Sequence, residues 1–232
     1  EHGKDELHVL ENEVEYLIES VKNSFSISID KKDVISSWVG LRPLVKDGNK
    51  KVTEISRKDE IFISKKGLIT IAGGKLTGYR KMAQRAVDFA IRSLKIRKIK
   101  SKTKSINLFT YDEDFCRKKF NDNGISDKKF QRLYNIYGDG CLEILQISKQ
   151  EKISDNFIIA EYLYVGRNEM CHTLLDFFTQ RNSGVYFEID QIKKYVKILE
   201  DYIRKNNSIS IDKWEREKLS LKKYISKLTT FI

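Results

Sequence analysis

The spacing of apolar residues divides the chain into two parts. The first part carries short apolar runs broken by glycine, whereas apolar residues of the second recur every three or four positions, which is typical of amphipathic helices. In the first part we expect a helix over about 7–22, an extended segment over 34–41 that stops at Pro43, and three short strands. These strands are expected at 52–57, 60–64 and 68–72, with a hairpin turn at 65–67.

A glycine pair follows the last of these apolar runs. Gly73 and Gly74 precede Lys75-Leu76-Thr77, and a helical stripe begins a few residues later. The order predicts a strand, a turn and a helix start. Adjacent glycines let the backbone approach a bound group, and the first turn of a helix carries unpaired N–H groups that favour an anion. The alternative is a tight connection without a ligand.

Beyond residue 103 strand patterns nearly vanish and helical spacing continues to the end. Asp212 and Glu215 resemble a capping box for the last helix. We therefore predict an α+β protein: a partial antiparallel domain over 1–104, then an all-α domain over 105–232. The helices are expected at about 127–137, 140–148, 157–168, 172–180, 188–205 and 213–229.

The net charge and the cysteine content limit which partners, covalent links and cell compartments we expect for this chain. The 232 residues carry a formal charge of +11, which favours either a polyanionic partner or a lysine-rich surface. The basic residues are spread along the chain and the aromatic residues fall at core spacings, so we expect no nucleic-acid partner. Three widely spaced cysteines support neither a disulfide framework nor a zinc site, and this favours the cytoplasm. No apolar stretch is long enough for a membrane span.

Catalytic motifs are scarce. The sequence lacks G-x-S-x-G, P-loop, G-x-G-x-x-G and H-E-x-x-H patterns. Cys171 and His172 are neighbours, so on a helix their side chains would diverge, and we expect no thiolate–imidazolium pair and no metal site. The lack of these motifs predicts that the chain is not a complete enzyme. Its first residue is Glu and not Met, which suggests a fragment.

Three basic residues lie at the ends of predicted elements in the first part: Arg42 before Pro43, Arg57 before a strand, and Lys75 in the glycine turn. Two guanidinium groups and an ammonium group around one cleft would bind a phosphate. The alternative is three unrelated surface cations, because sequence spacing alone does not show convergence.

Three blocks in the first part and one in the second, taken together, resemble the C-terminal half of FAD-dependent glycerol-3-phosphate dehydrogenases and oxidases. The order and spacing of the blocks are more specific than any single block, and the resemblance extends over nearly the whole chain. The blocks are Ser37-Trp38-Val39-Gly40-Leu41-Arg42-Pro43-Leu44, residues 56–62, residues 69–83, and residues 164–181.

The resemblance implies a function and assigns residues to it. Members of this family transfer hydride from C2 of glycerol 3-phosphate to FAD and form dihydroxyacetone phosphate. The resemblance places five residues against the flavin: Gly73, Gly74, Lys75, Leu76 and Thr77. Arg42 would lie at the reacting oxygen as a catalytic and substrate-binding residue, and Arg57 and Lys75 would hold the phosphate.

The resemblance also implies what lies outside this chain. The family's glycine-rich pyrophosphate site and its candidate general base belong upstream of Glu1, so we expect the chain alone to be inactive. Gly78 stands where the family commonly has Thr or Ser. Quinone or oxygen is the expected electron acceptor, and peripheral contact with the cytoplasmic membrane is compatible with the basic surface. The rival hypothesis is a non-catalytic basic module whose helices bind nucleic acid or a protein.

Overall fold

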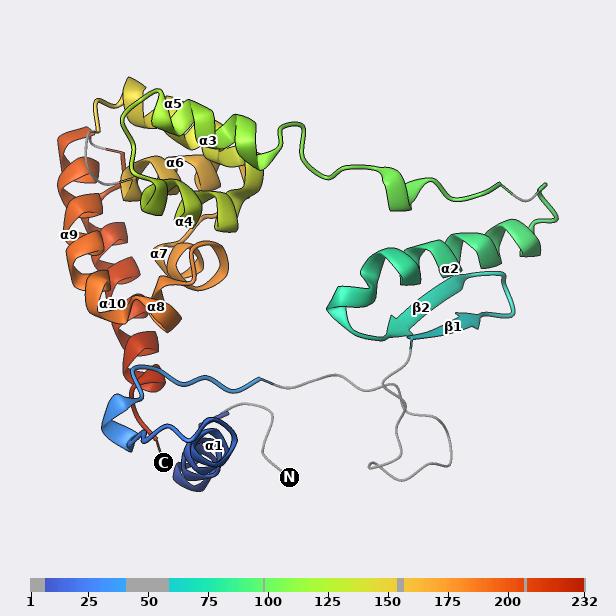
Figure 1. Ribbon diagram of the computed structural model, residues 1–232, viewed down its shortest axis with the longest axis horizontal. Coiled ribbons are helices and arrows are strands. Elements are labelled where there is room, and N and C mark those ends of the chain that lie inside the picture. Colours follow the sequence, from blue (N-terminus) through green and yellow to red (C-terminus); the bar gives the residue numbers. More distant parts are fainter. Residues whose placement is uncertain (1–6, 41–58, 98, 154–156, 207, 232) are drawn as a thin grey trace. The chain divides into compact units, whose positions relative to one another are not determined.

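The computed structural model describes residues 7–40, 59–97, 99–153, 157–206 and 208–231 (Figure 1). These residues form two compact units. One is Gly40–Leu108, and the other joins Glu1–Val39 to Phe109–Ile232. The grouping differs from a division at residue 104, because the N-terminal helix belongs with the C-terminal helices. The predicted boundary stays a prediction for the domains of a longer protein.

The described residues of the unit Gly40–Leu108 form a hairpin and a long helix. Strands β1 (Asp59–Ile63) and β2 (Ile69–Gly73) pair antiparallel, with Asp59 opposite Gly73 and Ile63 opposite Ile69. Helix α2 (Tyr79–Ser93) follows and contacts β2. The hairpin and the helix confirm the predictions for 60–64, 68–72 and the stripe beyond the glycine turn. The strand expected at 52–57 lies outside the described residues.

The helical unit begins with α1 (Glu11–Phe25), which confirms the first predicted helix. Residues 34–40 form no strand; Ser36 Oγ donates to the carbonyl of Tyr186 and the Ser37 amide to that of Leu228, at 2.6 and 2.8 Å. The other helices are α3 (Glu113–Asn121), α4 (Asp127–Tyr137), α5 (Cys141–Gln150), α6 (Ile158–Asn168), α7 (Leu174–Asp176), α8 (Gly184–Phe187), α9 (Ile189–Asn206) and α10 (Ile211–Leu228).

Most of these helices fall where the apolar spacing predicts them, and the differences have local causes. Helix α3 was not predicted, because only Cys116 and Phe120 of its residues are buried within a strongly charged segment. The expected helix at 172–180 is α7 followed by a π-helical turn, Phe177–Arg181. The capping box at Asp212 and Glu215 is wrong: Ser210 caps α10 by accepting from the Lys213 amide.

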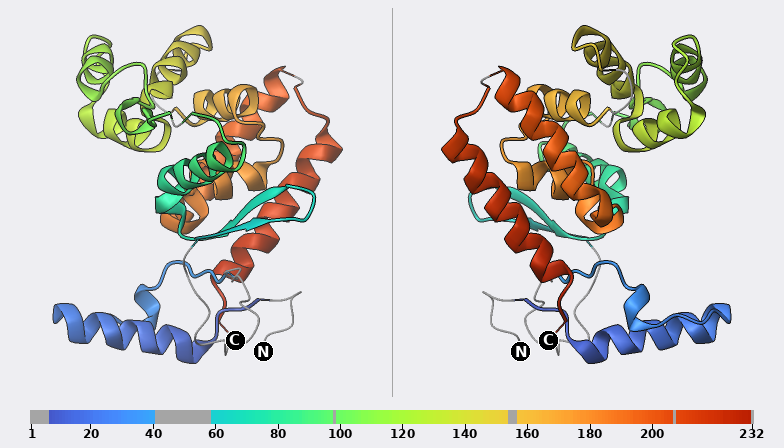
Figure 2. Two further views of the ribbon diagram at one scale, coloured as in Figure 1. Left: turned by 90° about the vertical axis from the view of Figure 1, so that its right-hand side faces the viewer. Right: turned by 90° about the vertical axis from the view of Figure 1, so that its left-hand side faces the viewer.

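One aromatic and aliphatic core, with buried residues between Cys116 and Leu228, joins the helices of the C-terminal part. Phe120, Phe130, Phe177 and Phe178 are fully buried there. The stripe of α9 is buried at Ile192, Leu199 and Ile203, and α9 and α10 lie side by side (Figure 2). The fold is thus α+β, with a small antiparallel sheet and a helical C-terminal part.

The unit Gly40–Leu108 has no comparable core. None of its described residues is buried, including those of α2. A groove of about 830 Å³ runs between α2 and residues 99–108, with Val87, Ile91 and Ile99 in its lining. Val87 is 57% exposed and Leu94, at the end of α2, is 68% exposed, so part of the apolar stripe that predicts α2 is open to solvent.

Candidate functional site at the glycine corner

The connection from β2 to α2, Gly73–Thr77, is the glycine corner. Gly73 and Gly74 have φ values of 81° and 79°, a left-handed conformation that residues with a Cβ rarely adopt. Lys75 returns to extended backbone and a short 3-10 turn, Leu76–Gly78, leads into α2. The strand, turn and helix start that the sequence predicts are therefore confirmed, and the local geometry explains why glycine occupies both positions.

The start of the helix at this corner is open. The Gly78 amide donates to the Lys75 carbonyl at 2.8 Å, and no side chain caps either the 3-10 turn or α2. Residues 73–77 are exposed, with Leu76 at 90%. Uncapped N–H groups at a helix start carry partial positive charge. The corner can thus accept an electron-rich or anionic group, with the Lys75 ammonium exposed beside it.

Of the three predicted phosphate ligands, only Lys75 is among the described residues. Arg42 and Arg57 lie outside them, so their convergence with Lys75 stays a prediction. In the sequence Arg57 stands two positions before Asp59, the residue that pairs with Gly73.

A buried ionic network in the helical unit was missed by sequence reasoning. The Glu161 carboxylate is 1% exposed, and it accepts from Arg132 Nη1 at 2.7 Å and from the Tyr137 hydroxyl at 3.0 Å. Arg132 Nε also lies 3.4 Å from Glu188, which accepts from the Tyr195 hydroxyl at 3.1 Å. Glu161 stands among apolar residues of α6, and this position is the only indication of the network in the sequence.

These contacts indicate a structural role for the network. Burial, followed by the charge of Glu161, raises the pKa of Tyr137 well above its usual range. Burial alone would lower the pKa of Arg132. The charge of Glu161 and its hydrogen bond outweigh this effect, so the pKa of Arg132 is raised. The network ties α4, α6 and the chain around α8 together and presents no free acid or base.

Other polar candidates of the helical unit also make contacts between elements. Arg181 donates to the Glu169 carbonyl at 2.7 Å, and its Nε lies 3.2 Å from the Glu169 carboxylate. This contact joins the end of α6 to the π-helical turn. Within the described part of the chain, no cluster of His, Cys, Asp and Glu could hold a metal ion, and no helix is long and apolar enough to cross a membrane.

Two tyrosines make the stability of the helical unit depend on pH. Burial raises the pKa of Tyr162 to about 12, and burial together with a hydrogen bond to Tyr224 raises that of Tyr186 to about 12. In the unfolded chain these protons leave near pH 10. Stability is therefore complete below pH 10 and falls as pH rises toward 12. Urea midpoints measured between pH 9 and 12 should show this fall in stability. Tyr186→Phe should make the fall smaller. An unchanged dependence of the midpoint on pH in that variant would contradict the assignment.

Comparison with known proteins places this geometry in a family. Residues 101–213 match the model of the C-terminal domain of alpha-glycerophosphate oxidase. The aerobic glycerol-3-phosphate dehydrogenase of Bacillus subtilis (strain 168) is 36% identical, over 82% of this chain and 38% of that protein. The enzyme of the same name from Staphylococcus aureus (strain USA300) is 34% identical, over 78% of this chain and 36% of its own length.

A solved structure agrees with these matches. The glycerol-3-phosphate dehydrogenase of Bacillus halodurans, complexed with FAD, superposes with a TM-score of 0.72 at 26% identity, covering 99% of this chain and 48% of that one. The fold and the matches define the class as the C-terminal portion of a flavoprotein. The chain belongs to the family of FAD-dependent glycerol-3-phosphate dehydrogenases and oxidases. It spans only about 38% of the Bacillus subtilis relative, and the rival hypothesis of an unrelated basic module is not supported.

Proposed function

We propose that the chain is part of a flavoprotein that oxidises sn-glycerol 3-phosphate to dihydroxyacetone phosphate. The family match over most of the chain carries this proposal. The glycine corner supplies its local basis, because two left-handed glycines and an uncapped helix start are grouped in one exposed turn. The dehydrogenase of Bacillus halodurans, which has the same fold, is complexed with FAD.

The glycine corner fits a flavin. Without Cβ atoms at Gly73 and Gly74, a planar ring can approach the backbone closely, and the open N–H groups of residues 76 and 77 can donate to its carbonyl oxygen. FAD, when bound, supplies the hydride acceptor. The corner would stabilise the negative charge of the reduced ring through the helix start and Lys75.

The basic residues would position the substrate. Arg57 precedes β1 and Lys75 follows β2 in the sequence, and we assign both cations to the phosphate. We assign Arg42 to the substrate hydroxyl, where its positive charge would stabilise the developing carbonyl oxygen. Fixing the phosphate at one end of the substrate would orient C2 for transfer, and this orientation is the main contribution of the site.

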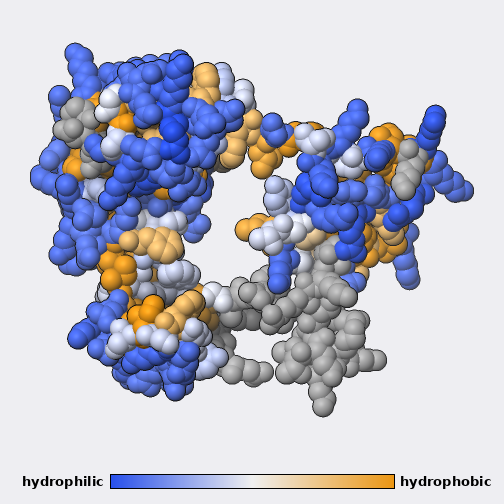
Figure 3. Space-filling model, in the orientation of Figure 1, coloured by the Kyte–Doolittle hydropathy of each residue, from blue (hydrophilic) through white to orange (hydrophobic). Residues whose placement is uncertain are grey.

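An upstream flavin-binding part would complete the site. None of the described apolar side chains of unit Gly40–Leu108 is buried, and some are visible as orange atoms in Figure 3, although these residues form a regular hairpin and helix. A unit of this kind is stable only when another element covers it. The matched relatives are more than twice as long as the region they share with this chain. We therefore propose that their upstream part covers the groove of α2, and that the chain alone is inactive.

A chimera tests the proposed function. The upstream part of the Bacillus subtilis dehydrogenase, joined to this chain in place of its own matched region, should purify with FAD and oxidise glycerol 3-phosphate with an artificial electron acceptor. Peroxide formation in air, compared with quinone reduction, then distinguishes the two proposed acceptors, oxygen and quinone. Fractionation with membranes tests the proposed cytoplasmic location with peripheral membrane contact. A folded chimera with neither flavin nor turnover would refute the proposal.

Replacing Arg57 tests the phosphate assignment. A charge-assisted hydrogen bond is worth about 1.5–3 kcal/mol, so Arg57→Ala in the chimera should raise KM about tenfold or more while kcat changes less. Steady-state kinetics with glycerol 3-phosphate measure the effect. Lys66→Ala, in the hairpin turn, is the matched control because it removes a cation at the opposite end of β1 and β2. Equal KM values for Arg57→Ala and the parent chimera would remove the assignment.

A further inference from the structure

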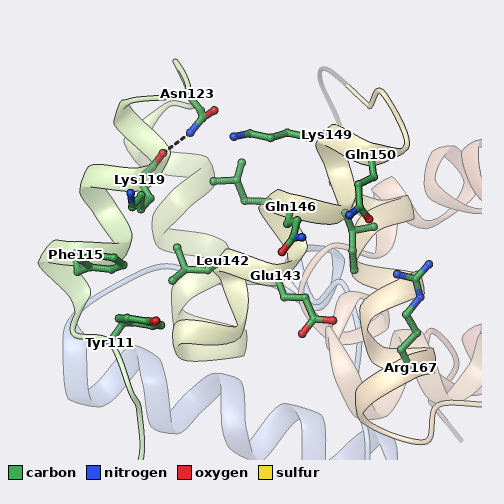
Figure 4. Close-up of a pocket in the computed structure, with 12 residues that line it drawn as sticks. Tyr111, Phe115, Lys119, Asn123, Leu142, Glu143, Gln146, Lys149, Gln150 and Arg167 are labelled. Atoms are coloured by element: carbon green, nitrogen blue, oxygen red, sulfur yellow. Dashed lines mark hydrogen bonds between the residues drawn. The ribbon is translucent and has the colours of Figure 1, made fainter.

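A groove on the helical unit has none of the residues assigned to flavin or substrate in its lining. It has a volume of about 640 Å³ and is formed by residues of α3, α5 and α6 together with Tyr111 (Figure 4). All its lining residues belong to one compact unit. The family's proposed reaction gives this groove no role, so its own chemistry is the guide to what it binds.

Three cations line the groove without a carboxylate partner among the described residues: Lys119 on α3, Lys149 on α5 and Arg167 on α6. Elsewhere in the helical unit Arg117, Arg132, Arg181 and Arg204 each pair with a carboxylate. The acid in the lining, Glu143, accepts from the Asn168 amide at 2.9 Å. Among the described lining residues three cations thus face a single carboxylate, and the groove carries a net positive charge.

The remaining lining is apolar on one side and rich in amides on the other. Tyr111 and Phe115 stack with their ring centroids 4.7 Å apart, yet they are 45% and 41% exposed. Leu142 lies next to them in Figure 4, and Gln146 and Gln150 face the groove from α5. Amide side chains both donate and accept, as a peptide backbone does. The combination suits a ligand with carboxylates, backbone amides and an apolar side chain.

The arrangement favours a peptide over a single phosphate or a nucleic acid. Figure 4 shows Lys119, Lys149 and Arg167 at separate points around the groove, so they are spaced for several charges along an extended ligand. The Phe115 ring already has Tyr111 stacked on it and the Lys119 ammonium 5.4 Å from its centroid. A nucleic-acid base would have to displace these contacts in order to stack there.

We propose that this groove binds an acidic segment of a partner protein. Carboxylates of the segment pair with Lys119, Lys149 and Arg167, and one apolar side chain rests on Tyr111, Phe115 and Leu142. A second copy of this chain is disfavoured because each copy carries a charge of +11. Exposed ion pairs give moderate affinity that weakens with salt, which is typical of a reversible contact.

The whole chain and a synthetic peptide are sufficient for the test. The probe is a fluorescein-labelled twelve-residue peptide of alternating Glu and Asp with a central Leu, and its anisotropy is followed at low salt. Binding should be saturable and should weaken as salt is added. The variant with Lys149→Glu and Arg167→Glu should raise Kd about tenfold or more, since it opposes the ligand's charges.

A control variant separates the groove from general charge. Lys193→Glu with Lys194→Glu on α9 changes the net charge equally, outside the groove, and should change Kd less than about threefold. Equal losses in both variants, or no peptide binding, would overturn the proposal. So would tighter binding of a labelled oligonucleotide that the groove variant abolishes. All four residues are exposed, so circular dichroism and urea midpoints should confirm folding. The test needs no flavin and is independent of the proposed oxidoreductase activity.

Discussion

Replacing Glu161 by Leu is expected to destabilise the helical unit by about 3 kcal/mol, the lower end of the range for breaking a buried ion pair. The substitution leaves Arg132 without its 2.7 Å partner and the Tyr137 hydroxyl without its acceptor. The loss falls at the lower end because the Arg132 side chain is 29% exposed and keeps Glu188 nearby. Urea unfolding followed by circular dichroism measures the change.

Two further variants define the origin of that loss. Arg132→Met together with Glu161→Leu removes both charges and should recover at least half of the lost stability, because an apolar pair leaves no isolated charge. Lys197→Ala, which breaks an exposed pair with Asp201, should change stability by no more than about 0.5 kcal/mol. If Glu161→Leu cost no more than Lys197→Ala, the network would have no structural role.

Replacing Gly74 by Val should abolish flavin binding in the chimera. Gly74 has a φ of 79°, which a β-branched residue does not tolerate, and the strain costs about 1–3 kcal/mol. The added side chain would also stand where we place the ring. FAD should therefore be nearly absent from the purified variant, with a ratio of flavin to protein absorbance at least about tenfold below that of the parent chimera.

Gly67→Val is the matched control for this substitution. Gly67 has a φ of 85° with open space around it, and it lies at the turn end of the same hairpin, away from Gly73. The strain is thus similar, but the flavin should stay bound. Equal flavin loss in both variants would mean that hairpin stability, and not contact at the glycine corner, determines binding.

The sequence predicts helices well where burial is periodic. The apolar stripe of α9 is predicted correctly because Ile192, Leu199 and Ile203 are all buried in one core. Helix α3 escapes detection because its buried residues are only Cys116 and Phe120, four positions apart. The cap of α10 is misplaced because Asp212 and Ser210 are both good capping residues, and only the backbone conformation selects Ser210.

The candidate site is predictable to a different degree. The glycine corner follows from the order of an apolar run, two glycines and a helical stripe, and its backbone geometry agrees. The network of Arg132, Glu161 and Tyr137 does not follow, because its members are separated by up to 29 positions and meet only through tertiary packing. The same limit applies to Arg42, Arg57 and Lys75, because sequence spacing does not show whether they converge.

The anchoring of Ser37 has a consequence for how the chain folds. Its amide and hydroxyl both reach the carbonyl of Leu228, which lies 191 positions later at the end of α10. Unit Gly40–Leu108 is therefore an insertion within the helical unit in sequence terms. During synthesis the N-terminal segment must wait until the last helix leaves the ribosome, and it docks by closing a very long loop. Docking of Ser37 against the end of α10 is thus a late event in the folding of this chain.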